Sequence, residues 1–204
     1  MDATSSSPPP VAVPPIPWED PARPGFFDRF VDTVRLMATA PGQAFQRMPT
    51  AGGIARPLLF GGMWLPFIDK SQLGEVGAAF GLSTGMTIVM MVVAPILVII
   101  GVFIQAAILH LMLMLIGGAN NGFEATTRVC SYAYTAQLAQ ILPFCGGILA
   151  TVWSLILLIV GLATTHRITH GKAAVAVVLP LVLCCAFTAA LLFMGVLAGV
   201  AASR

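Results

Sequence analysis

The longest apolar stretch of the chain runs from Met86 to Ile116, and it restricts the possible folds more than any other feature. Its 31 residues contain no Asp, Glu, Lys or Arg. As a helix it would be about 46 Å long, which exceeds the hydrocarbon core of a bilayer, roughly 30 Å thick. Either the helix tilts, or its first turns project beyond the bilayer before Pro95. We place the membrane-spanning part at residues 94–116.

The composition extends this expectation to the whole chain. Of the 204 residues, 58% are hydrophobic and 9% are charged, whereas soluble domains contain roughly 25% charged residues. A chain with so few charges cannot cover itself with a hydrated surface, so it is predicted to be an integral membrane protein. The net charge of +2 provides no basic patch, and we expect no nucleic acid partner.

The first 50 residues differ from the rest. Residues 1–24 hold eight of the fifteen prolines and a run of serines, which predicts a disordered cytoplasmic tail. Residues 25–50 place phenylalanine, valine and methionine at helical spacing between charged residues, as an amphipathic helix in the membrane interface would. A helix packed on the cytoplasmic ends of the spans is the alternative, and both descriptions can hold together.

Residues 51–204 are predicted to form an all-α domain with about five transmembrane helices. The expected spans are 54–68, 94–116, 125–142, 147–164 and 173–198. This arrangement puts eight of the ten Lys and Arg residues on one side: Arg23, Arg29, Arg35, Arg47, Arg56, Arg128, Arg167 and Lys172. Because cationic loops stay in the cytoplasm, the N-terminus is predicted to be cytoplasmic and the C-terminus outside.

A polar turn precedes the third expected span. Asn121 followed by Glu124 has the spacing of a capping box at a helix start. Glu124 and Arg128 are four residues apart, in the order that favours an ion pair on a helix. In the five-span arrangement this turn and the basic turn at 166–172 lie on the same cytoplasmic side, so they are predicted to form one composite surface.

Short ordered segments spread over residues 25–183 resemble the YIP1 family of membrane proteins, in its prokaryotic branch. The segments that carry this resemblance are Phe45 to Met48, Arg56-Pro57-Leu58-Leu59-Phe60, Leu109-His110-Leu111, Gly122-Phe123-Glu124-Ala125-Thr126, Arg128-Val129, Tyr132-Ala133, Ile141-Leu142-Pro143, Trp153, Gly161-Leu162, His166 and Gly171-Lys172-Ala173.

The resemblance implies a five-span helical domain with a cytoplasmic N-terminal region, in a bacterial cytoplasmic (inner) membrane. Eukaryotic relatives act in vesicle traffic between endoplasmic reticulum and Golgi and bind prenylated Rab GTPases. The acidic Asp-Leu-Tyr-Gly-Pro type motif of those relatives is absent from this sequence. The expected function is therefore membrane organisation or a trafficking-like protein interaction, with the lipid bilayer and a cytoplasmic protein as partners.

The sequence does not favour catalysis. It has no Asp or Glu after Glu124 and no recognisable nucleophile or phosphate-binding motif, so paired carboxylates are unavailable for acid–base chemistry inside the membrane. We expect a non-enzymatic protein without cofactor or metal. His166 and His170 are spaced like metal ligands on a helix, but no third ligand is evident; we interpret them as headgroup-level residues beside Arg167 and Lys172. The four cysteines lack a CxxC pair and are expected to be buried as small apolar residues.

His110 is the one titratable side chain deep in an expected span. A neutral imidazole bonded to a neighbouring helix is one interpretation, with Gln105, Gln137, Gln140, Thr151 and Ser154 as partners of the right kind. The other is a polar pathway, which gives the alternative function of a small-solute permease or channel around His110 and Gln137. The candidate functional positions are His110, Glu124, Arg128, Gln137, Gln140, His166 and Lys172.

Two glycines in the last expected span have the spacing of a helix-packing motif. Gly195 and Gly199 form a GxxxG pattern, in which small residues let two helix backbones approach closely. This pattern predicts self-association as a further possible interaction.

Overall fold

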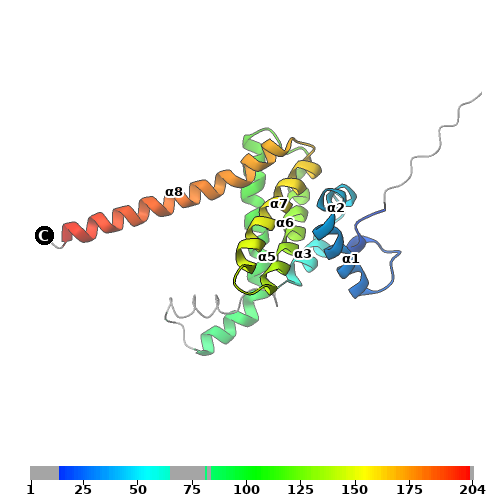
Figure 1. Cartoon of the computed structure of the whole chain (residues 1–204), viewed down its shortest axis with the longest axis horizontal. Helices are drawn as coiled ribbons and strands as arrows, with labels where there is room; N and C mark the ends of the chain where they lie inside the picture. Colours follow the sequence, from blue (N-terminus) through cyan, green and yellow to red (C-terminus); the bar gives the residue numbers. More distant parts are fainter. Residues whose placement is uncertain (1–13, 65–80, 82–83, 203–204) are drawn as a thin grey trace, which may run out of the picture.

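The structure is a computed structural model that describes residues 14–64, residue 81 and residues 84–202. Within these ranges every regular element is helical (Figure 1), which confirms the all-α fold class. The first half contains η1 (Pro17–Glu19), α1 (Phe26–Thr39), α2 (Pro41–Arg47) and α3 (Ala55–Gly62). The second half contains α5 (Thr84–Leu115), α6 (Gly122–Ala133), η3 (Tyr134–Ile141), α7 (Gly146–His166) and α8 (His170–Ala202).

Among the described residues, three helices are long and apolar enough to cross a membrane. They are Val92–Leu115 in α5, Gly146–His166 as the whole of α7, and His170–Gly195 in α8. These helices correspond to the second, fourth and fifth predicted spans. The chain is therefore an integral membrane protein by length and hydropathy of its helices.

The other two predicted spans are not among these three helices. Of the predicted span 54–68, the structure describes α3, which ends at Gly62, and residues 65–80 lie outside the described residues. The predicted span 125–142 is helical, but it is divided into α6 and η3 and is more polar than the three long helices. The count of five spans stays a prediction.

Helix α6 lies at the centre of the bundle and contacts α3, α5 and α7 (Figure 1). All nine residues from Ala125 to Ala133 are buried. Most of them are small (Ala, Thr, Ser or Cys), which lets the surrounding helices come close. The same central position forces the polar groups of α6 to find partners inside the protein.

A single glycine allows α2 and α6 to approach α7. A Cβ atom at Gly161 would lie 2.6 Å from a methyl carbon of Val129 and 2.9 Å from the ring of Phe45. Such distances are well inside van der Waals contact, so no larger residue fits without displacing a neighbour. Gly161 thus holds the N-terminal helix α2 against a membrane-spanning helix.

The predicted disordered tail is wrong for its second half. Ile16 is fully buried and Trp18 is 5% exposed, and the backbone N–H of Trp18 donates to Thr33 Oγ1 at 2.8 Å. The Trp18 indole also donates to the carbonyl of Arg56 at 2.6 Å. Two large apolar side chains among the prolines give this segment enough area to pack. Residues 1–13 of the predicted tail lie outside the described residues.

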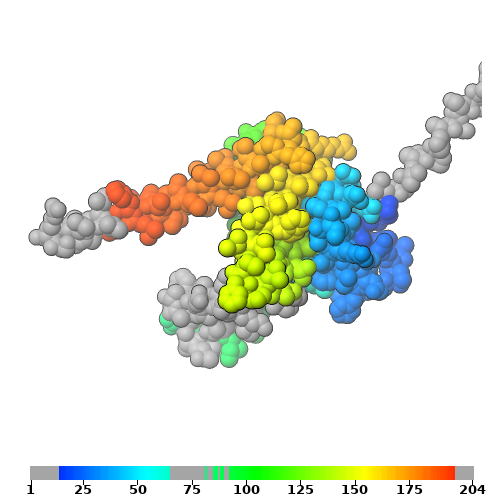
Figure 2. Space-filling model, in the orientation of Figure 1, coloured from blue at the N-terminus to red at the C-terminus, as the bar shows by residue number. Residues whose placement is uncertain are grey.

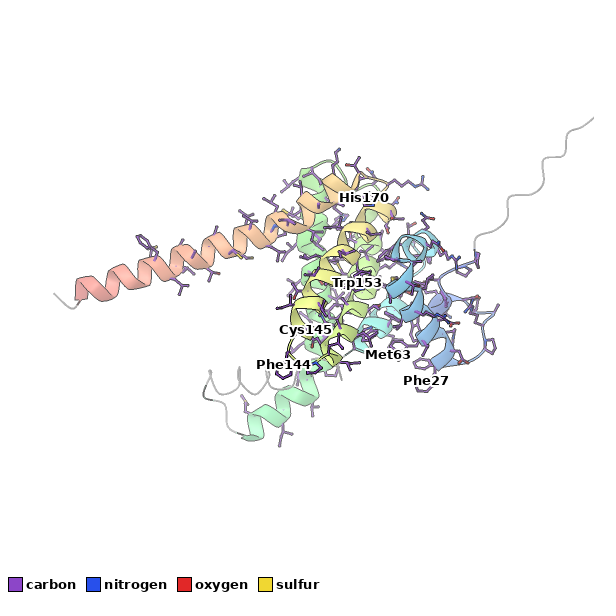
Figure 3. All side chains as sticks on the ribbon, in the orientation of Figure 1. Phe27, Met63, Phe144, Cys145, Trp153 and His170 are labelled. Atoms are coloured by element: carbon purple, nitrogen blue, oxygen red, sulfur yellow. The ribbon has the colours of Figure 1, made fainter. Side chains whose placement is uncertain are left out.

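The N-terminal helices cover one side of the bundle (Figure 2). In α1, Thr33 and Met37 face the core, while Phe27 is 75% exposed and points away from it (Figure 3). The helix therefore packs on the bundle, as the second of the two interpretations of residues 25–50 predicted. It also keeps an exposed apolar stripe that includes Phe27 and Val31, and its location in a membrane interface stays a prediction.

The cysteines depart from expectation. Cys130 is buried in α6, but Cys145, Cys184 and Cys185 are exposed on the surface of the described chain. The expectation of burial was wrong for these three because an apolar segment that crosses a membrane can face lipid as easily as protein. No two of the four are joined by a disulfide.

Candidate functional site

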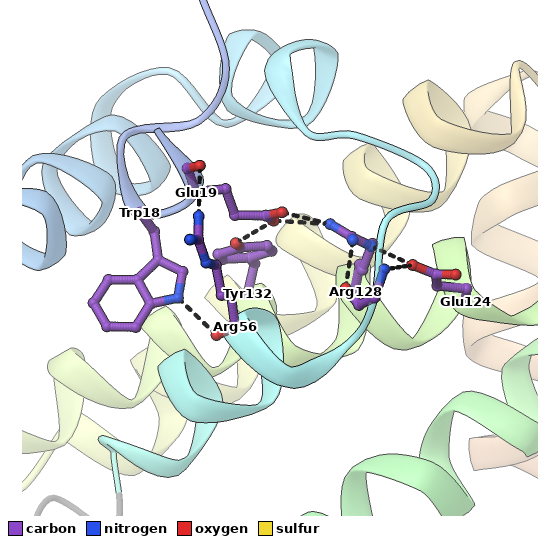
Figure 4. A network of polar contacts seen from close by, with 7 residues as sticks. Trp18, Glu19, Arg56, Glu124, Arg128 and Tyr132 are labelled. Carbon is purple, nitrogen blue, oxygen red and sulfur yellow. Dashed lines mark hydrogen bonds and ion pairs between the residues drawn. The ribbon is translucent and has the colours of Figure 1, made fainter. Parts of the chain in front are cut away.

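The side chain of Arg128 is at the centre of a buried ion-pair network on α6 (Figure 4). It is 0% exposed. Its Nη1 donates to both carboxylate oxygens of Glu19 at 2.9 and 2.8 Å, and its Nε donates to Glu124 at 3.2 Å. Its Nη2 donates to the carbonyl oxygen of Gly53. The guanidinium group is therefore bound on all sides by acceptors from three parts of the chain.

Each acceptor is fixed by a second contact. The hydroxyl of Tyr132, one turn beyond Arg128, donates to Glu19 at 2.6 Å. The backbone N–H of Gly53 donates to Glu124 at 2.8 Å. Arg56 donates to the carbonyl oxygen of Glu19 at 3.0 Å. We call these residues, listed here, the Arg128 cluster: Glu19, Gly53, Arg56, Glu124, Arg128 and Tyr132.

The charges of the Arg128 cluster balance. Arg128 is ion-paired with both glutamates, and Arg56, which donates to the backbone carbonyl of Glu19, brings the sum of the four formal side-chain charges to zero. A buried charge without a partner would cost several kcal/mol, and the pairing removes that cost. The predicted pair Glu124–Arg128 is confirmed, but Arg128 is buried in a helix and not part of a hydrated loop.

The capping box predicted at the start of α6 is wrong. Asn121 occupies the cap position, yet its side chain makes no capping bond. It donates instead to the carbonyl oxygen of Thr165 at the end of α7. Glu124 is likewise engaged by Gly53 and Arg128. Both side chains therefore form hydrogen bonds outside the first turn of α6, and the capping box does not form.

A second polar network on α6 links two histidines through Thr126. The Nδ1 atom of His166 accepts a hydrogen bond from the backbone N–H of Asn121 at 3.2 Å. A neutral His166 must therefore carry its proton on Nε2, which lies 3.0 Å from Thr126 Oγ1. The Thr126 hydroxyl also lies 2.9 Å from His110 Nδ1 and donates its own proton there when that nitrogen is unprotonated. We call His110, Thr126 and His166 the histidine chain.

The histidine chain corrects one expectation. His110 pairs with Thr126, whereas the expected partners Gln105, Gln137, Gln140, Thr151 and Ser154 lie elsewhere. The reason is that α6 inserts a threonine between the two histidine-bearing helices, which the spacing along one helix cannot reveal. His166 is fully buried at the end of α7, and its location at the headgroup level stays a prediction.

The two turns predicted to share a surface do meet. Asn120 donates to the carbonyl oxygen of His166 at 2.7 Å, and Asn121 reaches Thr165. His166 ends α7 and His170 begins α8, so the two histidines do not lie on one helical face. Lys172 is exposed near the start of α8. Among the described residues, no group of three His, Cys, Asp or Glu side chains is arranged to hold a metal ion.

Gln137 and Gln140 belong to neither network. Both lie on η3 and their amides are hydrogen-bonded to each other. They line a cavity that also involves Gln105, Thr151 and Ser154, but His110 is not among the residues that line it. The structure thus separates the two residues around which the polar pathway was predicted.

Sequence reasoning missed Glu19, Thr126 and Tyr132 as functional positions. Glu19 follows a tryptophan within the proline-rich segment. That aromatic–acidic pair was the available signal that the segment packs against the bundle and is not a disordered linker. Thr126 and Tyr132 carry no local signal, because a threonine or tyrosine in a helix is ordinary. Their importance comes from partners 40 and 113 residues away in sequence.

The Glu19→Gln substitution is expected to loosen the N-terminal segment much more than Glu124→Gln. Glu19 is 10% exposed and Glu124 is 35% exposed. Removing the charge of Glu19 leaves the buried Arg128 without its main partner, which should lower the stability of the N-terminal segment by about 3 kcal/mol. The more exposed pair with Glu124 should contribute at most about 1 kcal/mol of stability. Hydrogen–deuterium exchange of the 16–39 region should accelerate about a hundredfold in Glu19→Gln. Equal acceleration in both variants would contradict this ranking of the two carboxylates.

The Thr126→Val substitution is expected to destabilise the protein, whereas Thr127→Val serves as a matched control. Valine at 126 leaves a donor of His166 and an acceptor of His110 unpaired. Each unpaired buried group should lower the free energy of unfolding by about 1–3 kcal/mol. Among the described residues, the Thr127 hydroxyl bonds to the carbonyl of Phe123 in its own helix and to no other group, so its loss should destabilise the protein by under about 1 kcal/mol. Thermal unfolding of the purified chain in detergent, followed by tryptophan fluorescence, measures both. Equal midpoints for the two variants would show that the histidine chain adds no stability.

The family of this protein is identified by comparison with known protein families. The searches of curated proteins and of solved structures found no match. A family model for the Yip1 domain matches residues 34–192, from the middle of α1 to near the end of the described part of α8. Both polar networks and the three membrane-spanning helices fall within that match, apart from Glu19 and the last residues of the third helix. Because the model covers most of the chain, this protein belongs to the YIP1 family.

Proposed function

We propose that this YIP1-family protein is non-enzymatic and organises membranes or recruits a protein partner through a cytoplasmic cap. The cap comprises residues 16–47, which include η1, α1 and α2. The observation that carries the proposal is the anchoring of this cap by Glu19 to the buried Arg128 at 2.8 Å. Such an anchor holds an otherwise short N-terminal region in one orientation against the membrane-spanning helices.

The internal pairing of the ionisable groups supports a non-enzymatic role. In the Arg128 cluster each charged group is bound to another part of the same chain. In the histidine chain both imidazoles bond to Thr126. Groups that are engaged in this way hold elements together and are not directed at a substrate.

The outer face of α1 supports recruitment. Phe27 and Val31 are one turn apart and exposed, next to the exposed charge of Arg35. Apolar side chains beside a charged residue on a fixed helix are suited to a membrane surface or to a protein partner. Self-association through Gly195 and Gly199 is a further part of this proposal.

The alternative of a small-solute permease receives less support. It requires a polar path that contains both His110 and Gln137. In the described part of the chain, His110 is bonded to Thr126 and Gln137 to Gln140, and the two do not line one cavity. We therefore keep the interaction function as the proposal.

The proposed topology has a cytoplasmic N-terminus, an external C-terminus and five spans. It is supported by the contact between the turns at 117–121 and 165–169, because the two proposed spans between these turns would return the chain to the same side of the membrane. Reporter fusions before Met1 and after Ile168 should read cytoplasmic, and one after Arg204 should read external. A cytoplasmic reading after Arg204 would exclude the five-span arrangement.

Photo-crosslinking from the cap tests recruitment. A photoreactive amino acid at position 27 or 31, on the apolar stripe of α1, should give the same discrete protein adduct in native membranes. The same amino acid at Thr39, which is exposed on another side of the helix, is the control and should give none. Glu19→Gln should reduce the adduct because it loosens the cap. Equal adducts from positions 27 and 39, or an adduct insensitive to Glu19→Gln, would refute recruitment through this face.

A further inference from the structure

A cavity of about 510 Å³ lies among α5, η3, α7 and α8, away from both polar networks. It is located where α8 leaves the bundle as a single arm (Figure 1). Gln105 lies on its wall, ten residues before the end of the Val92–Leu115 span. At 1.5 Å per residue, that is about 15 Å from the helix end, near the middle of a bilayer.

The wall of this cavity is polar but uncharged. Three amides and two hydroxyls line it: Gln105, Gln137, Gln140, Thr151 and Ser154. Of the described residues around it, none is Asp, Glu, Lys, Arg or His. A charged ligand would therefore lose its hydration without gaining a counter-ion, which is costly at this depth.

The geometry of η3 explains why two amides face the cavity together. In a 3₁₀-helix, residues three apart are eclipsed, so Gln137 and Gln140 project on the same side. Eight residues is long for this type of helix. Gly146 holds η3 against α7, because a Cβ there would lie 2.6 Å from the carbonyl oxygen of Ala139. The amide pair is thus fixed beside the hydroxyls of α7.

Two of the polar side chains have unused hydrogen-bonding capacity. Gln105 and Ser154 have no side-chain hydrogen-bond partner among the residues that the structure describes. Gln137 and Gln140 satisfy one donor and one acceptor between them, which leaves the remaining amide groups available. Polar groups inside a membrane protein are stabilised when they find a partner, and a bound molecule can provide it.

The opening of the cavity is apolar. Ile104, Ile108 and Leu181 are exposed on the described surface of α5 and α8 and line the same cavity. On membrane-spanning helices such exposed side chains face lipid tails. The site therefore combines an uncharged hydrogen-bonding interior with an entrance suited to hydrocarbon.

We propose that this cavity binds an uncharged lipid, with its hydroxyl and ester groups on the glutamine amides and its acyl chains leaving past Ile104 and Leu181. Diacylglycerol has this chemistry, because it offers one hydroxyl donor and two ester carbonyl acceptors without a charge. The site is independent of the cap and uses none of the residues of the Arg128 cluster.

A photoreactive diacylglycerol tests the proposal on the full-length chain in phosphatidylcholine nanodiscs. Saturable labelling should map by mass spectrometry to the residues around Ile104 and Leu181. Unlabelled dioctanoylglycerol should compete, and dioctanoyl phosphatidic acid, which adds a charged phosphate to the same tails, should not. Equal competition by the two lipids would overturn the uncharged class of ligand.

Two sets of variants identify the site. Gln137→Met with Gln140→Met should weaken competition by dioctanoylglycerol about tenfold, because two hydrogen bonds are lost. Gln43→Met with Gln46→Met changes two exposed glutamines of α2 and should leave it unchanged. Ile104→Trp, at the exposed rim, blocks the entrance without altering the packed interior and should abolish labelling. Wild-type labelling in Ile104→Trp, or an unchanged affinity in the η3 variant, would refute the site.

Discussion

The fold depends on the need to satisfy a polar helix inside an apolar protein. Helix α6 is buried along its whole middle, yet it carries an arginine, a glutamate and several hydroxyls. Neither lipid nor a packed core offers water to such groups. The hydroxyl of Thr127 bonds within α6 itself, but Arg128 and Thr126 bond to other parts of the chain. Glu19, His110 and His166 provide these partners from three different elements.

This requirement makes the N-terminal segment part of the bundle. Glu19 is 109 residues from Arg128 in sequence, and it can reach the guanidinium only if Ile16 and Trp18 pack beneath α1. The burial of two apolar side chains and the formation of one ion pair therefore depend on each other. Loss of either should release both, which is why a charge-removing change at Glu19 acts on the whole cap.

The sequence was sufficient for local features and insufficient for contacts between distant segments. The apolar runs behind α5, α7 and α8 and the spacing of Glu124 with Arg128 gave correct predictions, because hydropathy and helical periodicity are local properties. The packing of Trp18 and the bond between Thr126 and His166 were missed. Proline content concealed the first, and nothing along one helix can indicate the second, since its partners belong to different helices.

A change of helix type gives one segment two different roles. Over Gly122–Ala133, the α-helical period aligns residues four apart, so Glu124, Arg128 and Tyr132 form one charged and polar row. Over Tyr134–Ile141, the 3₁₀ period aligns residues three apart, so Gln137 and Gln140 form an uncharged row. The first row is satisfied by the cap and the second borders the cavity. Because the charges are confined to the first row, the cavity can bind an uncharged group without competition from a buried ion.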